Sequence, residues 1–276
     1  MPGKGSNLIL YHAETAVCAA KVRVTLAEKG LDYEGRMINL QKGDQFAPDY
    51  VKLNPNAVVP TLIHEGNVLI ESTTINEYLD DAFPQPSLMP ANALGRAQVH
   101  GWTKKEDTIH DAINTMTACI VFRHDLLQKS PEERAERYNK MPDPAKREKW
   151  RRMMDEGLDS AIVDEALGRF AKHFQSMDKA LADQPWLAGE NFTLADVGLL
   201  SFFYRLEMLQ CLGLWSDHFV RVSDWYERAR QRPSFNAAIV DFISPAAHES
   251  YARIAGPLWP KVNESWKRAL AAQGSA

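Results

Sequence analysis

Cysteine is scarce in this chain. Its 276 residues include three cysteines, and these lie far apart, at Cys18, Cys119 and Cys211. No pair forms a CxxC motif, and an odd, scattered set does not suit a disulfide framework or a tetrahedral zinc site. The sequence therefore predicts a protein without structural disulfides, without a metal site and with its thiols reduced.

Long apolar runs and an excess of one charge are absent as well. No run approaches the ~18 apolar residues of a membrane span, and the first apolar stretch, Leu8–Leu10, is too short for a signal-peptide core. The 32 Lys and Arg residues nearly balance the 36 Asp and Glu residues. The resulting formal net charge of −4 gives no electrostatic footprint for nucleic acid or an anionic membrane. We therefore expect a cytoplasmic protein with neither of these partners.

What is present is the composition of an ordinary globular protein, 45% hydrophobic and 25% charged. Pro84, Pro86 and Pro90 interrupt the chain and predict a linker over residues 84–93. Residues 1–83 alternate short apolar runs with helical periodicity, which predicts a partly parallel sheet closed by a hairpin that turns at Glu65-Gly66. The expected elements, in chain order, are strand 8–11, helix 16–29, strand 33–40, helix 44–52, strand 61–64, strand 68–71 and a helix that follows Ser72.

The remainder, residues 94–276, shows helical periodicity alone and predicts an all-helical domain, so the whole chain is expected to be of the α+β class. Residues 128–160 carry many charges of both signs, which indicates solvated helices in an insertion. The run Thr193-Leu194-Ala195-Asp196 has the pattern of a helix capping box, which gives Asp196 a structural role. Residues 244–276 are predicted to form a loosely amphipathic C-terminal helix.

Chemically useful groups gather between Asn54 and Ser72. Pro60 directly precedes a strand, and a cis Val59-Pro60 bond would leave the Val59 backbone able to pair with an extended peptide. Glu71 ends the hairpin and suits an ammonium group. Ser72 offers a hydroxyl and a backbone N–H at a helix N-terminus, where a carboxylate is favoured. On spacing alone, the same residues also fit an ordinary turn, a helix cap and a solvated acid.

This stretch resembles the glutathione-binding signature of the glutathione S-transferase superfamily, with Asn54-Pro55 upstream of Val59-Pro60 and Glu71-Ser72 downstream. The resemblance covers residues 8–243 and implies a thioredoxin-like N-terminal domain, a helical C-terminal domain and a homodimer. It further implies that glutathione is the cosubstrate. Val59 would then pair with the cysteinyl backbone of glutathione, and Glu71-Ser72 would hold its γ-glutamyl end.

A glutathione enzyme must stabilise a thiolate, and a free thiol has a pKa near 8.5. In the branch that this chain resembles, a serine stands three residues before a cysteine at the start of the first helix; here Thr15 takes that place before Cys18. We predict that the Thr15 hydroxyl donates to the thiolate, with an ordinary helix cap as the alternative. Cys18 is the rival nucleophile for thiol–disulfide chemistry, but its expected place one turn inside the helix, with Val22 and Leu26, indicates burial.

The position before the Val-Pro pair departs from the family pattern. Many members carry Lys or Gln there, which reaches the glycine carboxylate of glutathione, whereas Val58 cannot. Lys42, in the loop after the second strand, is the predicted substitute, with Gln41 beside it, although both also fit a solvated loop. Glu106 and Asp107 lie on the first long helix, where the family's partner subunit often offers an acid to the γ-glutamyl ammonium.

The second substrate is expected between the two domains, against the first long helix. The resemblance implies a small hydrophobic or aromatic electrophile. His110, Met116 and Phe122 are the candidate lining residues, and His110 is the candidate acid for a leaving group. Core packing explains Met116 and Phe122 at least as well.

Two subgroup resemblances point to different functions. The runs Glu71–Leu79, Trp102–Lys104 and Lys149–Arg152 are similar to bacterial β-etherases of lignin breakdown, in which glutathione displaces a phenolate from the carbon next to an aryl ketone. The charged insertion and the C-terminal tail resemble ganglioside-induced differentiation-associated relatives. They favour the alternative of a non-catalytic binding or scaffold protein, and Thr15 and Val58 fit either function. An enzyme should lower the pKa of bound glutathione, whereas a scaffold need not bind it.

Overall fold

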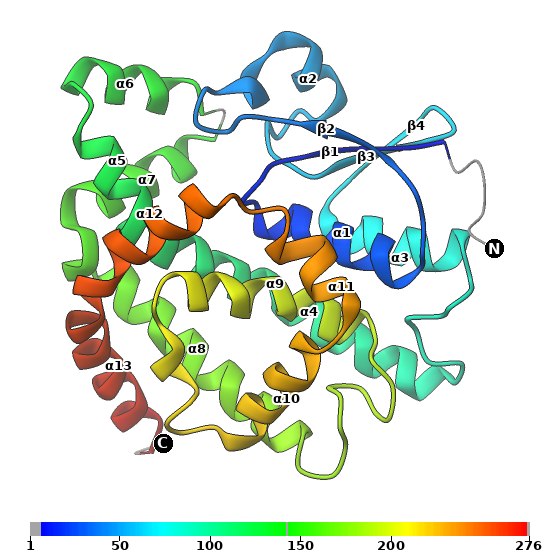
Figure 1. Cartoon of the computed structure of the whole chain (residues 1–276). Coiled ribbons are helices and arrows are strands. Elements are labelled where there is room, and N and C mark those ends of the chain that lie inside the picture. Colours follow the sequence, from blue (N-terminus) through cyan, green and yellow to red (C-terminus); the bar gives the residue numbers. More distant parts are fainter. Residues whose placement is uncertain (1–6, 142, 275–276) are drawn as a thin grey trace. The chain divides into compact units, whose positions relative to one another are not determined.

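The computed structural model describes residues 7–141 and 143–274. Its sheet has four strands in the order β2-β1-β3-β4. Strand β2 is parallel to β1, and β3 is antiparallel to both β1 and β4. Helices α1 and α3 cover one face of the sheet and α2 covers the other (Figure 1). The bounds are β1 Leu8–His12, α1 Val17–Glu28, β2 Glu34–Met37, α2 Pro48–Leu53, β3 Thr61–His64, β4 Asn67–Ile70 and α3 Ser72–Ala82. This order is the predicted thioredoxin-like βαβαββα fold.

Alternation along β1 separates the two faces of the sheet. Leu8 and Leu10 are buried, whereas Ile9 and Tyr11 between them are half-buried and point the other way. A register slip of one residue would expose the buried set, so burial fixes the register. The core on the α1 and α3 face consists of Leu8, Leu10, Val22, Leu26, Leu62, Ile75 and Leu79.

The predicted stop of the first helix and the predicted hairpin turn are confirmed. Gly30, just after α1, has φ +61°, and both turn residues, Glu65 and Gly66, have positive φ, as a two-residue hairpin turn requires. The expected helix 44–52 is instead a 3-10 turn, Asp44–Phe46, followed by α2. The interruption falls at Pro48, which fits a first helical turn but has no N–H to continue a preceding one.

Beyond Phe83 the described elements are helical, apart from an isolated bridge between Trp186 and Gly189. The tail, expected as one helix, forms two helices, α12 and α13. They are separated by the 3-10 turn Gly256–Leu258, whose proline lacks a donor N–H. The α-helices are α4 Ala93–Thr117, α5 Arg123–Leu127, α6 Pro131–Asn139, α7 Pro144–Glu156, α8 Ala161–Ala180, α9 Leu194–Met208, α10 Val220–Arg230, α11 Pro233–Phe235, α12 Pro245–Ala255 and α13 Trp259–Gly274. Two π-helical turns are Ala118–Phe122 and Asn236–Val240, and two further 3-10 turns are Gly157–Asp159 and Leu212–Leu214.

The chain divides into two compact units that do not follow the sequence in two simple halves. The sheet-bearing unit comprises residues 1–103, 184–201 and 226–244, and the helical unit comprises residues 104–183, 202–225 and 245–276. Helices α4, α9 and α10 therefore contribute residues to both units. The division at residues 84–93 stays a prediction about where independently folding domains would separate.

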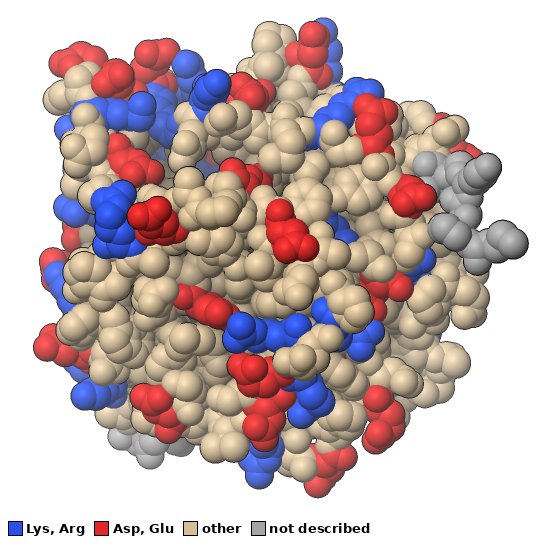
Figure 2. Space-filling model, viewed as in Figure 1, with Lys and Arg blue, Asp and Glu red and all other residues tan. Residues whose placement is uncertain are grey.

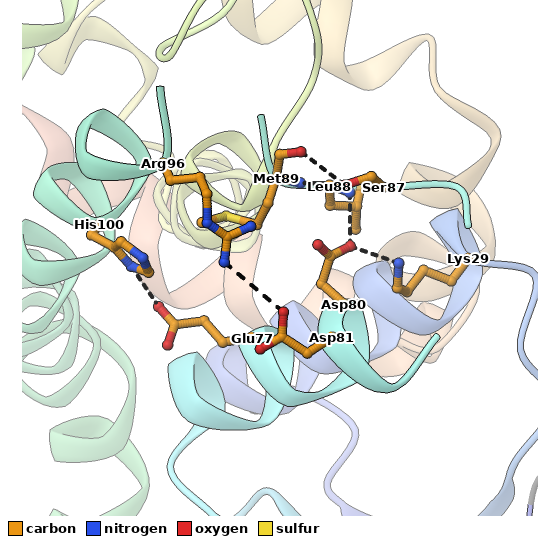
Figure 3. Close-up of polar contacts among 9 residues, drawn as sticks. All are labelled: Lys29, Glu77, Asp80, Asp81, Ser87, Leu88, Met89, Arg96 and His100. Atoms are coloured by element: carbon orange, nitrogen blue, oxygen red, sulfur yellow. Dashed lines mark hydrogen bonds and ion pairs between the residues drawn. The ribbon is translucent and has the colours of Figure 1, made fainter. Parts of the chain in front are cut away.

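The proline-rich segment is held to the sheet-bearing unit by a buried ion pair (Figure 3). The Lys29 ammonium, at the C-cap of α1, contacts the Asp80 carboxylate on α3 at 2.6 Å and donates to the carbonyl of Pro86 at 2.7 Å. The same Asp80 oxygen accepts the N–H of Leu88 at 2.8 Å. Both charged groups are almost fully buried, so each needs the other and the backbone partners supplied by the segment.

Asp196 at the start of α9 reaches back along the chain, as the capping pattern predicts. Its carboxylate accepts the N–H of Thr193 at 3.0 Å and that of Leu187 at 3.1 Å. The Thr193 hydroxyl donates to this carboxylate at 3.3 Å. The structural role of Asp196 follows from these contacts.

An aromatic core fills the helical unit around Phe174 of α8. Its ring lies 5.4–6.2 Å from those of Phe203, Trp215, Phe219 and Trp266. Helix α13, which carries Trp266, packs along α8 (Figure 1). Leu167, Phe170, Phe174 and Met177 form a buried stripe along α8, and Leu181, just after the helix, is buried as well.

The charged insertion is tied to the rest of the helical unit through Asp111 of α4. Its carboxylate accepts hydrogen bonds from Lys149 of α7 and Arg169 of α8. Partial burial by itself would raise the pKa of Asp111, but these two hydrogen bonds and charges hold it below its ordinary value. The insertion helices α6 and α7 each begin at a capping residue, Ser130 and Asp143, which accounts for ordered helices in so polar a segment.

None of the described helices is both long and apolar enough to cross a membrane. On the face drawn in Figure 2, acidic and basic side chains are interspersed among uncharged ones, and neither sign forms a large patch there. This distribution agrees with the balanced composition.

Candidate active site

Strand register brings three of the predicted segments to one edge of the sheet. Thr61, the first residue of β3, pairs with Tyr11 of β1 on one side and with Ile70 of β4 on the other. The chain just before Thr61 is Val59-Pro60, and the chain just after Ile70 is Glu71-Ser72. The loop that follows β1 leads to Thr15. These segments, far apart in sequence, therefore meet where their strands begin or end.

The Val59-Pro60 segment is held in place by two buried side chains. Tyr50 of α2 donates its hydroxyl to the Val58 carbonyl at 2.6 Å and lies 2.9 Å from Thr61 Oγ1. Asn54 donates to the same two oxygens at 2.9 and 3.1 Å. The Val59-Pro60 bond is cis, as expected. No described residue forms a backbone hydrogen bond with Val59, so its N–H and C=O remain available to an extended peptide.

Glu71 and Ser72 form the junction between β4 and α3. Glu71 is the N-cap of α3, has φ +69° and is exposed, and its carboxylate accepts from the Asn56 side chain at 3.3 Å. Ser72 is the first residue of the helix and is buried, so the interpretation of Ser72 as a plain N-cap is wrong. Positive φ at a non-glycine residue is strained and concentrates at ligand sites. Together they present a carboxylate beside the unpaired N–H groups of a helix N-terminus.

Thr15 lies in the turn before α1. The helix begins at Val17, and its N-cap position is occupied by Ala16 and not by Thr15. Thr15 itself is half-buried. Its neighbours Ala13 and Ala16 pack in the same cluster as Val59, which places the turn next to the segment proposed to bind the cysteinyl backbone of glutathione.

Cys18 is the second residue of α1 and is half-buried, not buried as predicted. The helix starts one residue later than expected, which puts Cys18 in its first turn and outside the core cluster formed by Val22 and Leu26. The other two thiols, Cys119 and Cys211, are buried, and burial raises the pKa of each to about 12. Thiolate chemistry is therefore disfavoured at both of these positions.

The proposed contacts to the glycine end of glutathione remain predictions. Lys42 and Gln41 are exposed in the loop after β2, and the backbone N–H groups of both are bound by the Asn39 side chain. Val58 is 45% exposed, so an apolar side chain does stand at the position where many relatives carry Lys or Gln.

The candidates for the second substrate lie in the helical unit. Met116 is fully buried, which fits core packing. Phe122 is half-buried and stacks on Trp150 at 6.0 Å. His110 is half-buried, stacks on Phe202 at 5.8 Å and accepts from Asn114 through Nε2 at 3.0 Å. On α4, Glu106 is buried and Asp107 is exposed.

Four residues that shape the site were not predicted as site residues. Tyr50 and Asn54 order the Val59 segment, and the Asn54-Pro55 pair was a sequence signal for the second of these. His12 and Arg23 are buried next to the Thr15 turn. A charged residue of a helix is expected on the solvent-exposed face, because such residues are seldom buried. The sequence therefore does not predict that Arg23 is buried.

Comparison with known proteins agrees with this site. The family models of the glutathione S-transferase N-terminal and C-terminal domains match residues 6–81 and 160–228. Protein LigF of Sphingobium sp. (strain NBRC 103272 / SYK-6) is 33% identical over 237 residues, which cover 83% of this chain and 91% of LigF. The tetrachloro-p-hydroquinone reductive dehalogenase of Sphingobium chlorophenolicum is 30% identical over 238 residues, which cover 84% of this chain and 95% of the relative. The crystal structure of the β-etherase LigF from Sphingobium sp. strain SYK-6 matches with a TM-score of 0.76 at 28% identity, covering 84% of this chain and 98% of that one. The chain belongs to the glutathione S-transferase family, whose members use glutathione as cosubstrate.

Proposed function

We propose that this protein binds glutathione at the sheet edge formed by Thr15, Val59-Pro60 and Glu71-Ser72 and directs its thiolate onto a hydrophobic carbon electrophile. The observation that carries the proposal is the strand register around Thr61, which brings these segments together. Glutathione needs three kinds of group in its binding site. These are a backbone that pairs with its peptide, an acid that binds its ammonium and a helix N-terminus that binds its carboxylate.

Each residue then has a defined role. The Thr15 hydroxyl donates to the thiolate sulfur and favours its ionised form. The Val59 backbone pairs with the cysteinyl backbone of glutathione, as an added strand does. At the γ-glutamyl end, Glu71 takes the ammonium, and the hydroxyl and N–H of Ser72 take the carboxylate. Lys42 is proposed to reach the glycine carboxylate.

The proposed electrophile is an aryl β-ether. Support comes from the similarity to the β-etherase LigF, which aligns with most of this chain. In the reaction, the glutathione sulfur forms a bond to the carbon next to an aryl ketone while that carbon's bond to a phenolic oxygen breaks. The phenolate leaves with the electron pair, so no oxidant or reductant is needed. His110 is proposed to supply its proton, with Phe122 lining the site, whereas the fully buried Met116 belongs to the core.

We further propose a homodimer and a cytoplasmic location. The dimer is usual for the family. The three cysteines, all within the described residues, form no disulfide, and a reducing compartment maintains thiols in this state. Sedimentation at two protein concentrations tests the dimer, because a particle of twice 31.1 kDa is expected at both.

A second candidate function rests on the half-buried thiol of Cys18 in the first turn of α1. Helix N-termini favour thiolates, and a mixed disulfide with glutathione would be the intermediate of a thiol–disulfide reaction. Cys18→Ala separates the two functions. Full ether-cleaving activity in this variant would exclude the thiol–disulfide function. Complete loss of activity with glutathione binding retained would establish it.

The main test is a calorimetric titration of the protein with glutathione, paired with the ultraviolet absorbance of the thiolate across pH. We expect binding in the micromolar-to-millimolar range and a thiolate pKa clearly below that of free glutathione. Glu71→Gln should weaken binding about tenfold, because it removes the charge that faces the ammonium and would cost about 1.4 kcal/mol. Absence of binding at several millimolar would overturn the proposal and favour a non-catalytic scaffold. A screen of aryl β-ethers against aryl halides then tests the substrate class.

A further inference from the structure

A buried guanidinium lies next to the turn that carries Thr15. Arg23 of α1 is 1% exposed. Its Nη1 donates to the carbonyl oxygen of Ala13 at 3.3 Å and lies 3.4 Å from Nδ1 of His12. Both of these partners belong to the segment that leads directly from β1 into the Thr15 turn. Arg23 therefore fixes the backbone from which Thr15 projects.

The other side of the guanidinium is covered by the segment 236–244, which packs against α1. Arg23 Nε donates to the carbonyl oxygen of Ala238 at 2.8 Å, and the Phe242 ring lies 4.3 Å from the guanidinium carbon. The same segment reaches the turn a second time, because the N–H of Ser244 donates to the Glu14 carboxylate at 2.7 Å. The Thr15 turn is thus held between α1 and this segment.

Arg23 has no acidic partner. Among the residues that the structure describes, no carboxylate lies within ion-pair distance of its guanidinium. The titratable groups that face it are His12 and Tyr33. Burial, and secondly the charge of Arg23, lower the pKa of His12 to about 4, so His12 is neutral at pH 7. Burial lowers the pKa of Arg23 itself to about 10, against the opposing effect of Tyr33, and the guanidinium stays charged.

An uncompensated buried charge is unusual, because removing a charge from water is unfavourable unless an opposite charge offsets it. Two ion pairs at the C-terminal end of α1 follow that rule: Lys29 contacts Asp80, and Arg232 contacts Glu28. The buried Lys21 of α1 donates to the Thr73 hydroxyl at 3.2 Å. Arg23 lies beside the turn where, on the proposed function, an anionic sulfur is bound.

We propose that Arg23 is a positioning residue for the glutathione thiolate: it fixes the Ala13–Thr15 turn and places there a positive charge that a bound anion offsets. The inference rests on the proposed function. It adds to the Thr15 hydrogen bond a long-range electrostatic contribution, which is strong because the surroundings exclude water.

The first test compares Arg23→Gln and Arg23→Lys with Arg232→Gln as the control. Arg232 donates two hydrogen bonds to Glu28, at 2.7 and 2.6 Å, and so binds α11 to the same helix away from the turn. We expect Arg23→Gln to raise the pKa of bound glutathione by about one unit and to reduce kcat/KM about tenfold below that pKa. Arg23→Lys, which keeps the charge, should retain most of the pKa depression. Arg232→Gln should lower the melting temperature and leave the thiolate pKa unchanged.

The outcomes separate this inference from the proposed function. If the wild-type protein does not depress the pKa of glutathione, the proposed function fails. If the wild-type protein and Arg23→Gln lower the pKa of glutathione equally, Arg23 only stabilises the fold and the inference is overturned.

A second pair of variants tests the charge without touching Arg23. Phe242 is half-buried over the guanidinium, so Phe242→Glu supplies the missing carboxylate, with Phe242→Gln as the uncharged control. We expect Phe242→Glu to raise the pKa of bound glutathione toward that of free glutathione and Phe242→Gln to leave it near the wild-type value. Equal pKa values in the two variants would contradict the inference, even where the Arg23 variants do not fold.

Discussion

Thr15 lies one residue before Ala16, the N-cap of α1, and removing its hydroxyl tests its proposed catalytic role. We expect Thr15→Val, which keeps the side-chain shape, to raise the pKa of bound glutathione. A hydrogen bond to a charged group contributes about 1.5–3 kcal/mol, so kcat/KM should fall about 10- to 100-fold. Thr15→Ser should keep the activity. An unchanged thiolate pKa in Thr15→Val would show that another group stabilises the sulfur.

The backbone conformation of Glu71 is a feature of a single residue that the sequence does not predict. The Glu-Ser pair is recognisable in the sequence, but the φ of +69° at Glu71 is imposed by the junction of β4 with α3. The burial of Arg23 and His12 is likewise set by the segment 236–244, more than 200 positions further along the chain. Local sequence patterns carry no information on such distant contacts.

Helix α2 and the residue that caps its C-terminal end hold the site through one hydroxyl and one amide. Tyr50 and Asn54 both bind the Val58 carbonyl and Thr61 Oγ1. We expect Tyr50→Phe to lower the free energy of unfolding by about 1 kcal/mol, since it removes a buried hydrogen bond but keeps the ring. Because the Val59 segment loosens, the KM for glutathione should rise more than kcat falls. A chemical-denaturation curve and steady-state kinetics measure the two effects, and a loss confined to kcat would contradict this role.

The segment between α3 and α4 depends on the ion pair of Lys29 with Asp80 (Figure 3). Asp80→Ala leaves a buried ammonium without its partner and should lower the free energy of unfolding by about 3–5 kcal/mol. The double variant Lys29→Met, Asp80→Leu removes both charges and should recover much of that loss. Equal destabilisation in the single and double variants would show that the backbone bonds to Pro86 and Leu88 matter more than the charges.

The elements themselves were largely predictable, because apolar alternation and helical periodicity fix type and order. The four strands, the hairpin turn and the helices α1 and α3 lie within a few residues of their predicted bounds. Boundaries were less predictable: α1 starts one residue late, which moves Cys18 into its first turn. The tail splits at Gly256–Leu258, although Gly256-Pro257 was a signal in the sequence. The division into compact units follows from tertiary contacts of α9 and α10, which periodicity does not show.

Across the whole molecule, two buried histidines couple stability to pH, one in each compact unit. Burial, and secondly Arg23, lower the pKa of His12 to about 4; burial, and secondly Lys105, lower that of His173 to about 3. Both are therefore neutral in the folded protein at pH 5, whereas in the unfolded chain they titrate near pH 6.5. The unfolded state binds more protons in this window, so the free energy of unfolding falls as the pH drops from 6.5 toward 4.

The size of this effect follows from the pKa shifts. Each histidine contributes up to about 3 kcal/mol of lost stability at pH 4, at about 1.4 kcal/mol per pKa unit. We expect His173→Gln to lose less stability than the wild-type protein between pH 7 and pH 4.5, measured by urea unfolding at each pH. His124→Gln is the matched control, because His124 is exposed on α5, and it should follow the wild-type curve. If His173→Gln also follows that curve, the acid sensitivity of the fold comes from other groups. In that case the burial of His173 does not keep it neutral.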